Sequence, residues 1–96
     1  MQDHPLTEDL TFEVLSRLPG MTLLEFGASW CGYCQAAQPI IREALRTYED
    51  IRHIRIEDGK GKRLGRQFKV KLWPSLILLA EGEEVARCVR PGDSAE

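Results

Sequence analysis

The sequence lacks the features that mark several classes of protein. No apolar run approaches the roughly 20 residues that span a bilayer, and residues Met1 to Pro5 lack the basic start and apolar stretch of a secretory signal. The 13 basic and 15 acidic residues give a net charge of −2, so no positive excess favours nucleic acid or an anionic membrane as a partner. These absences predict a cytoplasmic monomer that binds neither nucleic acid nor membrane.

The chain also has no internal repeat and no low-complexity linker. Its 96 residues are 43% hydrophobic and 29% charged, which is an ordinary balance for a globular protein. Domains are most commonly about 100–150 residues long. We therefore expect residues 1–96 to form a single domain.

Cysteine is scarce, and the odd number of three argues against a framework of structural disulfides. Two of the three lie in the motif Cys31-Gly32-Tyr33-Cys34, a spacing that in a reducing compartment indicates redox or metal chemistry. A closed zinc site commonly needs a second spaced pair of ligands, and His4, His53 and Cys88 do not form one. A structural disulfide across so short a loop would remove little chain entropy. We therefore expect redox chemistry and no metal.

Hydrophobic periodicity predicts alternating helices and strands. The order of elements is helix, strand, helix, strand, helix, strand, strand, and it predicts an α/β fold with a mixed central sheet flanked by helices. Pro39 falls inside the second helix, where a proline ring is expected to kink it. The expected elements are helices at 7–18, 31–48 and 60–68, and strands at 21–26, 51–57, 74–80 and 84–90, with a turn at 81–83.

The cysteine motif follows an apolar strand and a short loop, which places Cys31 at a helix N-terminus. Unpaired amides and the helix dipole favour negative charge there, so Cys31 is expected to react as a thiolate. A thiolate attacks a substrate disulfide and forms a mixed disulfide. Cys34 follows one helical turn later on the same face, where it can resolve that intermediate. The pattern therefore predicts thiol–disulfide exchange, with Cys31 as the outermost sulfur.

The stretch from Leu23 to Cys34, with Trp30 directly before the first cysteine, resembles the active-site strand and loop of the thioredoxin family. Pro39 stands where that family has a proline in the following helix. The segment Trp73-Pro74-Ser75-Leu76 resembles the family's cis-proline segment, and Glu81-Gly82-Glu83 resembles the turn between its last two strands. The similarity implies a thioredoxin-like fold and a thiol–disulfide oxidoreductase that reduces protein disulfides.

The resemblance also implies roles for individual residues. Cys31 would attack and Cys34 would resolve, so that the redox-active disulfide between them needs no separate cofactor. Glu25 matches the family's buried carboxylate, which assists proton transfer at the resolving cysteine. The partners implied are disulfide-containing protein substrates and a thioredoxin-reductase-like electron donor. The expected substrate-binding residues are Trp30, Gly32, Tyr33, Trp73, Pro74 and Gly92.

Glu25 is a single acidic residue in an apolar strand, and burial disfavours the ionised form of a carboxyl group. We therefore expect the pKa of Glu25 to be raised, as a general acid or base requires. Alternatively, Glu25 pairs with Arg55 on the neighbouring strand, and both arrangements can hold together.

The sequence departs from the family at several positions. Gly32-Tyr33 replaces the Gly-Pro of reductive thioredoxins and is found in related disulfide isomerases, so an oxidant or isomerase is an alternative. A redox-inactive binding or chaperone module is another. Trp73 is bulkier than the usual residue before the cis-proline. The family's first strand is hard to find, and residues 91–96 stand where its last helix begins, so we expect the C-terminal helix to be missing or truncated.

Four further residues carry simpler expectations. Trp30 is expected to be a partly exposed contact surface rather than part of the core. Cys88 is expected to be a small buried hydrophobic residue. His53 is expected to be an ordinary strand residue, and His4 to lie in a loose terminus.

Overall fold

The computed structural model describes residues 2–4 and 10–91, which form a five-stranded sheet in the order β1-β3-β2-β4-β5. Strand β3 is parallel to both β1 and β2, whereas β4 is antiparallel to β2 and to β5. The predicted mixed α/β architecture is confirmed. The strands are β1 (Gln2–His4), β2 (Met21–Gly27), β3 (Arg52–Glu57), β4 (Ser75–Ala80) and β5 (Glu83–Val89).

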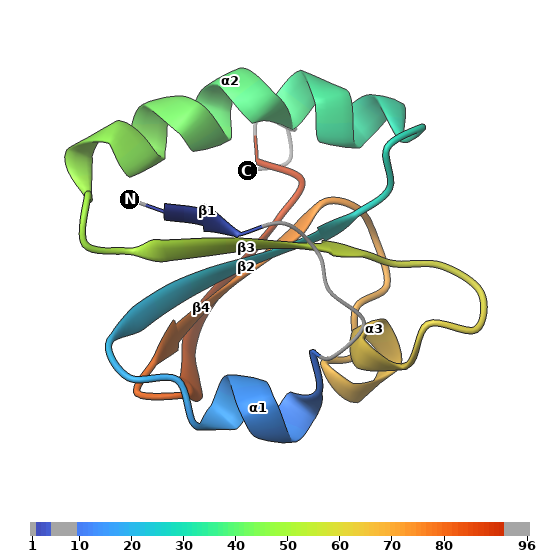
Figure 1. The fold of residues 1–96 in the computed structure, drawn as a ribbon. Helices are drawn as coiled ribbons and strands as arrows, with labels where there is room; N and C mark the ends of the chain where they lie inside the picture. Colours follow the sequence, from blue (N-terminus) through green and yellow to red (C-terminus); the bar gives the residue numbers. More distant parts are fainter. Residues whose placement is uncertain (1, 5–9, 92–96) are drawn as a thin grey trace.

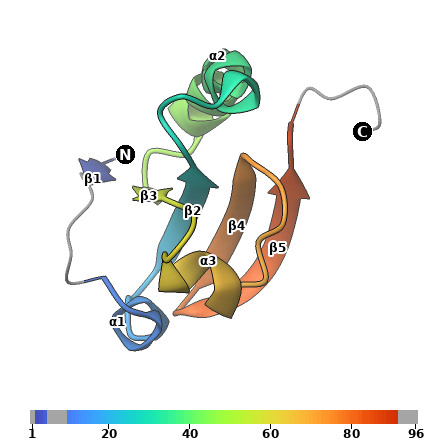
Figure 2. The same cartoon turned by 90° about the vertical axis from the view of Figure 1, so that its right-hand side faces the viewer.

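The helices lie on both sides of the sheet. The long helix α2 (Gly32–Thr47) lies on one side, and the short helices α1 (Phe12–Ser16) and α3 (Arg63–Gln67) lie on the other, as Figures 1 and 2 show. Pro39 lies inside α2. Among the described residues, no helix combines the length and the apolar character needed to cross a membrane.

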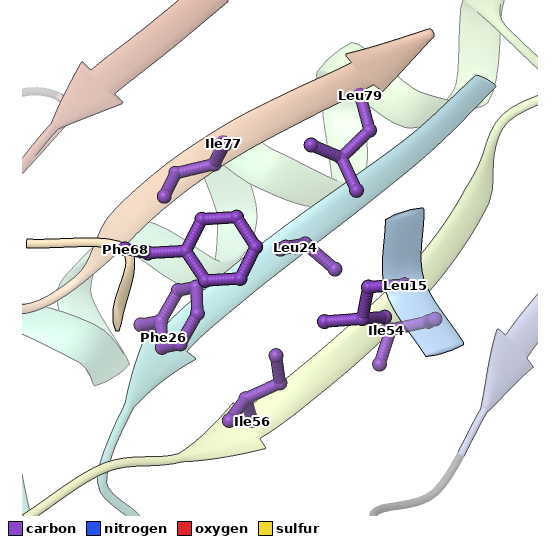
Figure 3. Packing of buried hydrophobic residues seen from close by; sticks show 8 residues of the cluster. All are labelled: Leu15, Leu24, Phe26, Ile54, Ile56, Phe68, Ile77 and Leu79. Carbon is purple, nitrogen blue, oxygen red and sulfur yellow. The ribbon is translucent and has the colours of Figure 1, made fainter. Parts of the chain in front are cut away.

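The main core lies between the sheet and the two short helices (Figure 3). Its centre is Phe26 of β2, which is fully buried and whose ring lies 5.5 Å from that of Phe68. The other members of this cluster are Leu15, Leu24, Ile54, Ile56, Ile77 and Leu79. On the opposite face, α2 buries residues four positions apart, Ala37, Ile41 and Leu45. That spacing places them on one stripe of the helix.

The observed elements follow the predicted order closely, with a difference at the N-terminus. The first strand, which was hard to find in the sequence, is β1, and its Asp3 and His4 are in register with His53 and Ile54 of β3. The expectation of a loose terminus at His4 was therefore wrong. A strand of three residues is too short to show a hydrophobic alternation in the sequence. It is a strand because its backbone pairs with that of β3.

Helix α1 is shorter than predicted. The predicted range of 7–18 includes residues 7–9, which lie outside the described residues, and α1 begins only after Thr11. The Thr11 side chain accepts a hydrogen bond from the amide of Val14 at 3.1 Å, so it satisfies one of the free N–H groups of the first turn. The cap accounts for the later start.

Replacing Gly82 with alanine is expected to destabilise the protein by about 2–3 kcal/mol. Gly82 lies in the β4–β5 turn with φ of 82°, and a Cβ atom there would collide with the backbone carbonyl of Ser16 in α1. Urea unfolding measures the effect. The matched control is Gly20→Ala, because Gly20 has φ of 73° but open space around its Cβ position. We expect that variant to lose only about 1 kcal/mol; equal losses would show that the collision with α1 is unimportant.

Candidate active site

The two cysteines lie where the chain passes from β2 into α2 (Figure 1). Cys31 is the N-cap of α2, as the sequence predicted, and its Sγ accepts a hydrogen bond from the amide of Cys34 at 3.2 Å. Its own amide donates to the carbonyl of Ala28 at 3.1 Å. Both thiols are free, and the two residues are 7% and 6% exposed. Cys31 is thus not measurably more exposed than Cys34, which differs from the expectation that it is outermost.

The sulfur of Cys34 occupies space that a glycine leaves open. A Cβ atom at Gly27, the last residue of β2, would lie 2.6 Å from the Sγ of Cys34. The pKa of the Cys34 thiol is raised to about 11, first by burial and then by the hydrogen bond and charge of Cys31 and the charge of Glu25, against a smaller opposite effect of the Ala28 backbone. Cys34 is therefore a protonated thiol at neutral pH.

Glu25 of β2 is buried and is bonded through both carboxylate oxygens. Its Oε1 lies 2.7 Å from Nε2 of His53, and its Oε2 accepts a hydrogen bond from Nε2 of Gln38 at 2.6 Å. The same Nε2 of Gln38 also donates to the carbonyl of Cys34 at 3.2 Å. Gln38 thus connects the carboxylate directly to the helical turn that carries the second cysteine.

The pKa of Glu25 is lowered, so the predicted increase was wrong. Burial raises this pKa, as expected, but the hydrogen bonds from His53 and Gln38 and the charges of His53 and Arg55 together outweigh it. The predicted pairing with Arg55 is confirmed, with Nε of Arg55 at 3.8 Å from Oε1 of Glu25. His53 is no ordinary strand residue: it is 3% exposed and is bonded to this carboxylate.

The lowered pKa of Glu25 predicts a specific dependence of stability on pH. A carboxyl group whose pKa is below its unfolded value, here 4.5, contributes stability that is present above the unfolded pKa and lost as pH falls through the folded pKa. The stability advantage of the wild type over Glu25→Gln should therefore shrink as pH falls below about 4.5. Denaturant unfolding at a series of pH values measures it. The exposed Glu49 provides the control Glu49→Gln, and a parallel change in both variants would contradict the prediction.

The predicted cis bond between Trp73 and Pro74 is confirmed. Trp73 packs against the cluster of Ala28, Cys31 and Cys34, and its Nε1 donates to Oδ2 of Asp58 at 2.9 Å. This hydrogen bond connects the bulky side chain before Pro74 to the loop that follows β3.

Exposed aromatic side chains surround the buried sulfurs. Trp30 is 72% exposed, in agreement with its expected exposure, and its ring meets that of Trp73 at 73° with centroids 5.3 Å apart. Tyr33 is 56% exposed and lies under the guanidinium of Arg90. Gly32 is exposed and Pro74 is buried. Gly92, the remaining predicted substrate-binding residue, lies outside the described residues.

Comparison with known proteins agrees with this geometry. The family model described as Thioredoxin matches residues 5–95 of the chain. The chain belongs to the thioredoxin family. The solved structure of reduced thioredoxin 2 from Pseudomonas aeruginosa PAO1 is 49% identical, with a TM-score of 0.82, and the match covers 99% of this chain and 88% of that one.

More distant thioredoxins match a shorter part of the chain. Thioredoxin H-type from Fagopyrum esculentum is 30% identical over 69 residues, which cover 72% of this chain and 60% of that protein. Thioredoxin H2-1 from Oryza sativa subsp. japonica is 29% identical and is covered over 50% of its length. The chain thus spans about half to three fifths of these plant thioredoxins.

Within this thioredoxin fold, four residues that contact the predicted site were not predicted from the sequence: Gln38, His53, Asp58 and Arg90. Gln38 could have been found, because it follows Cys34 by one helical turn and so lies on the same face of α2. His53 and Arg90 offered no such signal, since they reach the site from β3 and from the end of β5.

Within residues 10–91, no group of three or more His, Cys, Asp and Glu side chains could hold a metal ion. The third cysteine, Cys88 on β5, is half-buried rather than buried.

Proposed function

We propose that this member of the thioredoxin family is a thiol–disulfide oxidoreductase that reduces disulfide bonds in proteins through Cys31 and Cys34. The observation that carries the proposal is the position of Cys31 at the N-cap of α2, where its sulfur accepts the amide of Cys34 at 3.2 Å. An amide donor and the positive end of a 16-residue helix both stabilise a thiolate, which is the attacking species in disulfide exchange.

In the first step, the Cys31 thiolate attacks one sulfur of the substrate disulfide. A bond forms between Cys31 and that sulfur, and the other substrate sulfur leaves as a thiolate. Cys34 then loses its proton and attacks the sulfur of Cys31, which releases the second substrate sulfur as a thiolate and leaves a disulfide between Cys31 and Cys34. The substrate gains two electrons, and the cysteine pair loses them.

The order of the two steps follows from the environment of Cys34. Burial first, and then the hydrogen bond and charge of Cys31, raise the pKa of Cys34 to about 11 in the reduced protein. Once Cys31 is held in a mixed disulfide, its negative charge is gone, and the part of the increase in the Cys34 pKa that Cys31 causes is lost. Cys34 therefore remains protonated until a substrate is attached, when it becomes the nucleophile.

We assign Glu25 as the acceptor of the proton that Cys34 loses. The lowered pKa of Glu25 keeps its carboxylate ionised at neutral pH, and Gln38 bridges it to the Cys34 carbonyl. Because Cys34 holds its proton more tightly than Glu25 would, the transfer is uphill by itself. It proceeds together with formation of the Cys31–Cys34 bond, which removes the Cys34 thiolate as it forms.

The substrate-binding residues in this proposal are those that surround the sulfurs. Trp30 and Tyr33 offer exposed rings, Gly32 leaves the approach to Cys31 open, and Trp73 and Pro74 form the neighbouring segment. Gly92 joins this group on the family resemblance alone. Exposed aromatic side chains next to a reactive group suit the binding of an extended protein segment.

The proposed setting is a reducing one. We place the protein in the cytoplasm as a monomeric single domain that is recharged by a thioredoxin-reductase-like electron donor. The thioredoxin family membership supports such a donor, and a dithiol that reduces other proteins needs a compartment in which thiols stay reduced.

Two measurements test the function. With insulin as the disulfide substrate and dithiothreitol as the reductant, the protein should accelerate reduction well above the rate of dithiothreitol alone. Equilibration of Cys31 and Cys34 with glutathione then decides the direction: a reductase requires a potential below that of the glutathione pool. A potential above it would favour an oxidant or isomerase. If the protein did not accelerate insulin reduction, the redox-inactive binding module would be favoured instead.

A further inference from the structure

Arg90 holds an unusual backbone conformation directly after β5. Its φ is 52°, in the left-handed region that non-glycine residues rarely adopt. Such a conformation is strained in a residue with a Cβ atom and persists only where the surroundings hold it. The amide of Arg90 donates to the carbonyl of Pro74 at 2.9 Å, so the strained residue is fastened to the segment that lies beside the cysteines.

The side chain of Arg90 is also held in one place. Its Nε donates to the carbonyl of Trp73 at 2.8 Å, and its Cζ lies 3.8 Å from the centre of the Tyr33 ring. A guanidinium group that stacks on an aromatic ring and bonds to a carbonyl is fixed before any substrate arrives. Arg90 therefore joins two parts of the candidate site, the first turn of α2 between the cysteines and the segment before β4.

The charge of this guanidinium is not neutralised within the described part of the chain. No hydrogen bond or ion pair there joins Arg90 to a carboxylate, and its terminal nitrogens have no acceptor in residues 10–91. The carboxylate of Asp58, which reaches the same segment, is bonded to the ring of Trp73. A half-buried cation thus stands over the ring of Tyr33, which lies between the two cysteines in the sequence.

We propose that Arg90 is a specificity-determining residue that selects protein disulfides with an acidic side chain next to the disulfide. The proposal rests on the proposed oxidoreductase function and names the substrate class of the same site. The planar guanidinium can donate two parallel hydrogen bonds to a carboxylate, whereas a basic side chain in the same position would be repelled. Because Arg90 is held in place beforehand, little side-chain freedom is lost when the carboxylate binds.

The test uses two synthetic disulfide-bonded peptides that differ only in having Asp or Lys next to one cysteine. We expect the wild type to reduce the Asp peptide with a kcat/KM about fivefold higher, in keeping with a partly exposed charge pair. Arg90→Gln should remove most of this ratio, and Arg90→Lys should retain part of it, because it keeps the charge but loses the planar fork. Raising the salt concentration should lower the wild-type ratio, since exposed charges are screened.

The controls separate this inference from the function itself. Arg46→Gln removes the same charge at the far end of α2, where the side chain is 77% exposed, and should leave the ratio unchanged. Arg90→Asn offers a neutral side chain that tolerates the left-handed region, in case Arg90→Gln does not fold. Reduction of neither peptide by the wild type would contradict the proposed function. Reduction of both peptides with a ratio that neither salt nor the Arg90 variants change would overturn the inference alone.

Discussion

Cys31→Ser is expected to lower catalysed disulfide reduction to the rate of dithiothreitol alone. The serine hydroxyl does not ionise near neutral pH, so the attacking thiolate is lost even though α2 and its N-cap are retained. Cys34→Ser should behave differently: the first attack remains possible, but the mixed disulfide is no longer resolved by the protein. Incubated with an excess of a disulfide-bonded peptide, that variant should gain the mass of one peptide strand.

The assay that checks both variants is insulin reduction together with intact-protein mass spectrometry. Cys88→Ser is the matched control, because it removes a half-buried thiol on β5 and leaves the pair at α2 unchanged. It should retain wild-type turnover. Full activity in Cys31→Ser, or a stable adduct on Cys88 in place of Cys31, would show that the roles are wrongly assigned.

Phe26→Ala is expected to destabilise the protein by about 3–5 kcal/mol. Phe26 is fully buried at the centre of the main core, and its ring lies 5.5 Å from that of Phe68, so the substitution leaves a cavity between β2 and the helices α1 and α3. The free energy of unfolding of a native protein is about 5–15 kcal/mol in total, so this single change should remove a large part of the stability. Urea unfolding followed by circular dichroism measures it.

Phe12→Ala is the control for the aromatic contact. The ring of Phe12 also packs on Phe68, with centroids 5.1 Å apart, but Phe12 is 44% exposed. Its truncation therefore removes less buried surface and should cost only about 1 kcal/mol. Similar losses in the two variants would mean that contact with Phe68, rather than burial in the core, is what Phe26 contributes.

The parts that the sequence predicted well are those whose signal is local. The nearly continuous apolar character of β2 and the stripe of Ala37, Ile41 and Leu45 on α2 depend on neighbouring residues of one element. The cysteine motif and Trp73-Pro74 are likewise short contiguous segments. Strand β1 had no such signal, because its three residues belong to the sheet only through the backbone of β3.

The protonation of Glu25 shows the limit of this reasoning. Its strand neighbours Leu24 and Phe26 correctly indicated burial, and burial alone raises a carboxyl pKa. The pKa of Glu25 is nevertheless lowered, because its carboxylate is hydrogen-bonded to His53 of β3 and to Gln38 of α2. Neither lies near Glu25 in the sequence, so the sign of the shift depended on contacts that strand pairing and helix packing create.

The sequence by itself determined the family, the order of the main elements and the positions of Cys31 and Cys34, because these depend on short motifs and on hydrophobic periodicity. The tertiary structure alone decided the environment of those groups. It placed a histidine on the buried carboxylate, left room for the Cys34 sulfur against Gly27, and set Arg90 over Tyr33. Hydrogen bonds, charges and steric limits act over a few ångströms in space, and in this protein those distances join residues from different strands and helices.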